Sequence, residues 1–139
     1  MQDLAGKTVL ITGASGTVGT ACADVLLGKG ARLVLTDRVA PDPALIDHPD
    51  VCWQAADVTD RAAVEAAHQA ALEQFGPIDA AILAAGVEGP VALVEEISEA
   101  DIDRVVAINL KGCLFWMQAC LREMKPRGGG SIVALSSIS

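Results

Sequence analysis

The sequence of 139 residues contains no tyrosine, and aromatic residues of any kind make up only 3% of it. It also lacks an excess of basic residues, because ten lysines and arginines stand against eighteen acidic residues, for a formal net charge of −8. Nucleic-acid binding relies on basic side chains at phosphates, so this charge disfavours a nucleic-acid partner. No apolar run approaches the roughly 18 residues of a membrane-spanning helix, so we expect no membrane partner.

The four cysteines form neither a CxxC pair nor a group with histidine at metal-ligand spacing. We therefore expect no disulfide framework and no metal site, and we interpret the cysteines as small core residues of a reduced protein. The first residues also lack the basic region and the long apolar stretch of a secretory signal. Together these absences predict a cytoplasmic location.

The chain does contain enough apolar residues for one folded domain, since 52% of its residues are hydrophobic. A chain of nearly this size buries roughly 68–70% of its unfolded surface. Short runs rich in β-branched residues alternate with longer helical stretches. Strands are expected at 8–12, 31–36, 51–55, 78–84 and 131–136, helices at 17–29, 60–75 and 98–124, and an irregular, proline-containing connection at 38–50.

Strands that alternate with helices of this length predict β-α-β units with right-handed crossovers. The first expected strand is apolar on both faces, which is typical of a parallel strand covered by helices on both sides. The predicted fold class is therefore α/β, a doubly wound parallel sheet, and nothing in the composition marks a second domain.

The strongest local signal is the glycine-rich segment between the first expected strand and the first expected helix. Gly13 would allow a tight turn, Gly16 a close approach of the backbone to a pyrophosphate, and Gly19 close packing of helix on sheet. The unpaired amides at the helix start would then face the phosphates. We interpret the segment as a dinucleotide site, the alternative being a purely structural turn. The candidate cofactor-binding residues here are Gly13, Ser15, Gly16, Thr17, Val18 and Gly19.

An acidic residue, Asp37, follows the second expected strand, eighteen residues after Gly19. A carboxylate there can accept hydrogen bonds from ribose hydroxyls, and it would repel a 2′-phosphate, which favours NAD(H) over NADP(H). Arg38 keeps NADP(H) open, because a guanidinium could hold that phosphate. The alternative for Asp37 is a solvated strand end.

Five separated segments, taken in order, resemble the short-chain dehydrogenase/reductase family over essentially the whole chain. After the glycine turn they are Asp57-Val58-Thr59, the stretch ending in Ala84-Ala85-Gly86, Asn109 in the long helix, and the strand that leads to Ser137. The resemblance implies a Rossmann-type fold with strand order 3-2-1-4-5. It also implies hydride transfer between a nicotinamide cofactor and a small-molecule alcohol or ketone. The further cofactor-binding residues it implies are Asp57, Val58, Ala84, Ala85 and Gly86, although Ala84 and Ala85 replace two asparagines of the family pattern.

The resemblance also implies two catalytic residues. Ser137 would hydrogen-bond the substrate oxygen, with Ser136 supporting the strand and Ser139 a weaker candidate. Asn109 would hold a water that connects the active-site lysine to solvent. The alternatives are a polar strand end for Ser137 and a buried asparagine bonded to backbone for Asn109.

In this family a tyrosine moves the proton, with a lysine four residues further on, and both lie beyond the serine. We therefore expect residues 1–139 to form an NAD(P)-binding domain that is incomplete at its C-terminal end, truncated after the fifth strand and inactive alone. His48 and His68 are not plausible substitutes for the tyrosine. The alternative functions are a non-catalytic dinucleotide-binding or regulatory module, and an interaction protein whose glycine turn is only structural.

Apolar residues surround the long expected helix instead of forming one stripe. Such a helix should be buried on both sides. We expect one side to cover the sheet and the other to meet a second copy, giving a homo-oligomer (dimer or tetramer) through helix 99–124. The alternative is that a further part of the same chain covers that side.

Overall fold

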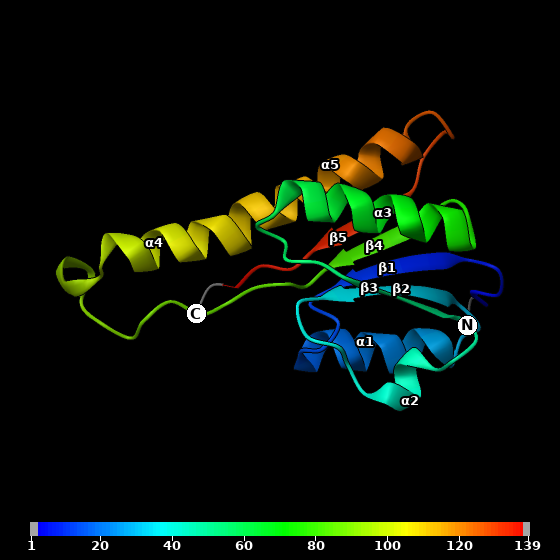
Figure 1. Cartoon of the computed structure of the whole chain (residues 1–139), viewed down its shortest axis with the longest axis horizontal. Coiled ribbons are helices and arrows are strands. Elements are labelled where there is room, and N and C mark those ends of the chain that lie inside the picture. The colour runs from blue at the N-terminus through cyan, green and yellow to red at the C-terminus, as the bar shows by residue number, and fades with distance from the viewer. Residues whose placement is uncertain (1–2, 138–139) are drawn as a thin grey trace.

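Five parallel strands form one sheet in the computed structural model, which describes residues 3–137 (Figure 1). The strands are β1 (Thr8–Thr12), β2 (Arg32–Asp37), β3 (Val51–Ala55), β4 (Ala80–Leu83) and β5 (Ser131–Ala134). Their order across the sheet is β3-β2-β1-β4-β5. The chain thus builds outward from β1 to β3 and then returns to the other side of β1, which confirms the expected doubly wound topology.

Helices cover both faces of this sheet. Figure 1 shows α1 and α2 on one side and α3 and α5 on the other, with α4 projecting past the carboxyl ends of the strands. The helices are α1 (Thr17–Leu27), α2 (Pro43–Ile46), α3 (Arg61–Phe75), α4 (Glu99–Val105) and α5 (Cys113–Met124), with a short 3₁₀ turn η1 (Val94–Glu96). Within residues 3–137 no helix has both the length and the apolar character needed to cross a membrane.

Three elements are shorter than expected: α1 ends at Leu27, β4 spans only Ala80–Leu83, and β5 spans only Ser131–Ala134. Two further parts of the expected secondary structure differ in kind. The connection 38–50 contains the short helix α2, because the Asp42 carboxylate accepts a hydrogen bond from the Ala44 amide and Pro43 suits a first helical position. The long helix is continuous from 99 to 124, but Val106–Gly112 is a π-helical turn, called η2. This wider turn adds a residue to the helical repeat in the middle of the segment.

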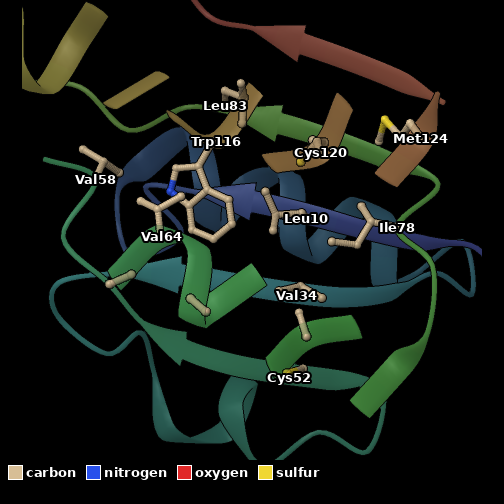
Figure 2. Packing of buried hydrophobic residues seen from close by; sticks show 14 residues of the cluster. Leu10, Val34, Cys52, Val58, Val64, Ile78, Leu83, Trp116, Cys120 and Met124 are labelled. Carbon is tan, nitrogen blue, oxygen red and sulfur yellow. The ribbon is translucent and has the colours of Figure 1, made fainter. Parts of the chain in front are cut away.

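The apolar core lies in two layers, one on each face of the sheet. Every residue of β1 is buried, as expected for a strand covered on both sides. Figure 2 shows the layer beneath α3 and α5, where the fully buried Trp116 packs in one cluster with Leu10, Val34 and Val64. The second layer, beneath α1, includes Ile11, Leu33 and Leu35.

The outer strand β5 is much less covered than β1. It lies at one edge of the sheet beside β4, and its Val133 side chain is 53% exposed. Leu135, just after the strand, is 44% exposed. The central strand β1 and the edge strand β5 therefore differ sharply in burial.

His68 is a buried histidine on α3. Only 8% of it is exposed, and its Nε2 atom has no hydrogen-bond partner among the described residues. Burial lowers the pKa of His68 below its usual 6.5, Glu123 on α5 opposes this shift, and Arg122 adds to it. The folded protein therefore holds this imidazole neutral more strongly than the unfolded chain does.

This burial predicts a loss of stability in mild acid. Below pH 6.5 the unfolded chain takes up a proton at His68 that the folded protein resists, so the free energy of unfolding falls as the pH drops. Urea titrations between pH 6.5 and about 5.5 should show a weaker pH dependence for His68→Gln than for the unsubstituted protein. His48→Gln, which changes an exposed histidine, is the matched control for the loss of a histidine. Equal slopes for all three proteins would contradict the role of His68.

Candidate functional site

A cleft lies at the carboxyl ends of β1, β2, β3 and β4, where parallel α/β sheets bind their ligands. It collects most of the predicted cofactor residues from four separate connections. Its lining consists of Gly13 and Gly16, Asp37 and Arg38, Ala56 to Val58, Ala84 to Val87, and Ile108. The topology therefore brings the glycine turn, the acidic residue and the segments after β3 and β4 to one place.

The glycine turn packs too tightly to admit side chains at two of its positions. Gly13 has φ +66°, and a Cβ atom there would lie 2.8 Å from the Ala85 Cα atom. A Cβ atom on Gly19 would lie 2.2 Å from the Gly13 carbonyl oxygen. Glycine at these positions lets α1 begin directly against the end of β1.

The start of α1 suits a negatively charged group. Gly16 is the N-cap residue, and within the described chain no side chain caps the helix and no acidic residue stands in its first turn. The first amides of an α-helix have no partner within the helix, and the helix dipole favours an anion beside them. Because Gly13 and Gly16 line the cleft, this terminus fits the diphosphate of a dinucleotide.

The Asp37 carboxylate is held at the mouth of the cleft by two backbone amides. It accepts hydrogen bonds from the Ser15 N–H at 3.0 Å and from the Arg38 N–H at 2.7 Å. The Ser15 hydroxyl in turn donates to the Val39 carbonyl. These bonds tie the glycine turn to the end of β2, so the acidic group and the helix start have a fixed relative position.

A second carboxylate, Asp57, lines the cleft beyond β3. Hydrogen bonds from the Thr59 amide (2.9 Å) and the Thr59 hydroxyl (2.7 Å) lower the pKa of Asp57, and the positive charge of Arg38 lowers it further. Asp57 is therefore ionised at neutral pH. The cleft thus presents the cationic Arg38 side chain together with the carboxylates of Asp37 and Asp57.

The opposite wall is formed by the segment after β4, which is fixed by two polar side chains. The Thr12 hydroxyl accepts a hydrogen bond from the Ala85 amide at 3.1 Å. Asn109, in the π-helical turn, accepts from the Val87 amide and donates to the Val87 carbonyl, both at 2.9 Å. The side-chain amide of Asn109 thus pairs with one residue of this wall, although Asn109 does not itself line the cleft.

The remaining candidates do not line the cleft. Ser15, Thr17, Val18 and Gly19 belong to the glycine turn and the first turn of α1, and Val18 points largely to solvent. Ser137 follows β5 at the same edge of the sheet, whereas Ser139 lies outside the described residues.

Three lining residues were not predicted from the sequence: Ala56, Val87 and Ile108. Each is apolar and carries no chemical signal of its own. Each is also adjacent to a predicted residue, namely Asp57, Gly86 or Asn109, so extending the predicted segments by one position would have found all three.

Comparisons with known proteins agree with this geometry. Residues 7–139 match the family model described as short chain dehydrogenase. Levodione reductase from Leifsonia aquatica is 36% identical over 95% of this chain and 52% of its own length. D-threitol dehydrogenase from Mycolicibacterium smegmatis is 38% identical over 96% of this chain and 54% of its own length.

The crystal structure of levodione reductase superimposes with a TM-score of 0.86 at 34% identity, covering 93% of this chain and 53% of that one. The chain spans about half the length of the curated relatives it matches. The family match covers nearly all of the sequence, and the strand order agrees with it. The chain therefore belongs to the short-chain dehydrogenase family of oxidoreductases, whose Rossmann-type fold implies a nicotinamide dinucleotide cofactor.

Proposed function

We propose that the protein is an NAD(H)-dependent oxidoreductase that transfers hydride between nicotinamide and an alcohol or ketone. The observation that carries this proposal is the pairing of an uncapped α1 terminus with the Asp37 carboxylate in one cleft. The relatives named levodione reductase, D-threitol dehydrogenase and sorbitol dehydrogenase support the substrate class. The bound dinucleotide would supply the carbon that gives or takes the hydride.

Each wall of the cleft has a separate task in this proposal. The first amides of α1 bind the diphosphate, and the Asp37 carboxylate accepts hydrogen bonds from the ribose hydroxyls of the adenosine half. Asp57 and Val58, which line the cleft, would face the adenine, and the backbone of Ala84 to Gly86 would form the facing wall. Because Ser15 and Arg38 already orient the Asp37 carboxylate, binding does not have to order it.

The preference for NAD(H) predicts a specific effect of Asp37→Ala. Hydrogen bonds to a charged group contribute about 1.5–3 kcal/mol, so the variant should bind NADH at least about tenfold more weakly. The affinity for NADPH should not fall in parallel, because the variant no longer has the Asp37 carboxylate that repels the 2′-phosphate. Fluorescence titration with both nucleotides measures the ratio, and Asp47→Ala, an equal charge change outside the cleft, is the control. An unchanged NADH/NADPH ratio in Asp37→Ala would refute the assignment.

The catalytic part of the proposal assigns Ser137 to the substrate oxygen and Asn109 to support of the site. The family resemblance gives Asn109 a bound water, and its two hydrogen bonds to Val87 support a role in fixing the cleft wall. Proton transfer would come from a tyrosine and lysine beyond residue 139. The 139-residue chain should therefore bind NADH without turning over substrate.

Ser137→Ala tests the catalytic assignment in a protein that continues into the tyrosine–lysine pair. Loss of one hydrogen-bond donor at a reacting oxygen typically lowers kcat about 10²–10³-fold. We expect that loss with secondary alcohols or their ketones, measured by NADH absorbance, while the NADH affinity stays within about twofold. The neighbouring Ser136→Ala should lose far less activity. A Ser137→Ala variant with the original kcat would exclude this role.

We also propose that a second copy of the protein covers the outer side of the helical segment. Large apolar side chains project there at intervals of one or two helical turns and are 40–56% exposed. The inner side of the same segment buries Trp116, Cys120 and Met124. The residues of this exposed stripe are Ile102, Val106, Leu110, Leu114 and Leu121.

A charge in the exposed stripe should dissociate this assembly. Leu114→Glu places a carboxylate where apolar contact is expected, so light scattering should give the mass of one chain for the variant and a multiple of it for the unsubstituted protein. Val25→Glu, at an exposed valine on α1, is the matched control and should not change the mass. A single-chain mass for the complete unsubstituted protein would indicate that its own chain covers the stripe.

The cysteines support the proposed cytoplasmic location. All four are free thiols. Burial raises the pKa of Cys113, and burial together with Glu123 raises the pKa of Cys120 to about 12. These two thiols therefore stay protonated and unreactive at neutral pH, as expected of core residues in a reducing compartment.

A further inference from the structure

The π-helical turn η2 contacts the cleft at three of its seven positions. Ile108 lines the cleft directly, and Asn109 pairs with the backbone of Val87 in one wall. Gly112, the last residue of the turn and its only buried one, lies against Val58 in the other wall. The turn is thus positioned to set the separation of the two walls.

The contact between Gly112 and Val58 leaves no room for a side chain. A Cβ atom on Gly112 would lie 2.5 Å from Val58 Cγ2, 2.8 Å from Val58 Cβ and 3.1 Å from the Val58 carbonyl oxygen. Real carbon atoms do not approach so closely without a shift of one partner. Because the backbone of Val58 is involved as well as its side chain, rotation of the side chain alone cannot relieve the overlap.

Val58 itself has little freedom to move away. It is β-branched, which restricts its χ1 angle, and only 9% of it is exposed. Figure 2 shows it at one edge of the buried cluster that also contains Trp116 and Val64. With the core on one side and the turn on another, the open direction for the Val58 segment is the cleft that it lines.

We propose that Gly112 is a positioning residue for the adenosine half of the dinucleotide. Its missing side chain lets Val58 rest against the helical segment and keeps the Asp57–Val58 wall clear of the ligand. This inference rests on the dinucleotide function proposed above. In this inference Gly112 does not touch the dinucleotide, and it affects the dinucleotide affinity only through its contact with Val58.

A double-mutant cycle tests the proposal with ADP-ribose and NADH as probes, measured by calorimetry on the complete protein. Gly112→Ala should weaken the binding of both ligands about tenfold and to the same extent. The reason is that the displaced Asp57–Val58 wall would face the adenosine half, which ADP-ribose and NADH share. The Val58→Gly/Gly112→Ala double variant should bind within about twofold of Val58→Gly, since removal of both Val58 Cγ2 and Val58 Cβ makes room for the new methyl group. Circular dichroism reports the folding of each variant.

Gly89→Ala provides the matched control. It makes the same chemical change in the loop after β4, where the new Cβ atom would meet nothing closer than Val105 Cγ2 at 3.7 Å. We expect its affinities to equal those of the unsubstituted protein.

The outcomes separate this inference from the proposed function. If the unsubstituted protein binds neither probe, the dinucleotide function fails and the inference fails with it. If it binds both and Gly112→Ala binds equally well, or if Val58→Gly does not rescue the loss, only the role of Gly112 is overturned. If Gly112→Ala does not fold, the double variant should fold and bind like Val58→Gly, and a double variant that does not do so overturns the proposal.

Discussion

The cleft depends above all on the close approach of β1 and α1. The carbonyl of Gly13 lies where a side chain on Gly19 would be, so the helix can start directly at the strand end. That contact directs the unpaired amides of the helix toward the space beside Asp37. The crossover to β2 then brings the carboxylate within hydrogen-bonding distance of the Ser15 amide. A bulkier residue at Gly13 or Gly19 would move the start of α1, with its partial positive charge, away from the Asp37 carboxylate.

Much of the sheet could be predicted because its signals are local. The bounds of β1 and β3 agree with the sequence analysis residue for residue, since short β-branched runs end at clear turn signals. The helix α2 was wrongly expected to be irregular, although Asp42 followed by Pro43 is itself a helix-start signal. The three prolines of that connection obscured this signal.

The π-helical turn could not be predicted in the same way. Residues 106–112 continue the apolar helical pattern on both sides, and the turn meets Val87 and Val58, which are distant in the sequence. The partners of Asp37 were equally hidden, because they are backbone amides that every residue but proline possesses. Spacing from the glycine turn was enough to identify the carboxylate, but not what orients it.

The uncovered strand β5 has a consequence for the 139-residue chain in solution. An edge strand offers a row of unsatisfied main-chain groups, and here Val133 and Leu135 add exposed apolar surface beside that row. Such an edge is a template on which another molecule can add its own strand, which leads toward intermolecular β-structure. Self-association by this route grows with concentration and is open-ended, in contrast to the closed symmetry of a native dimer. For a polypeptide of these 139 residues, association at high concentration would therefore begin at β5 and not at the cleft.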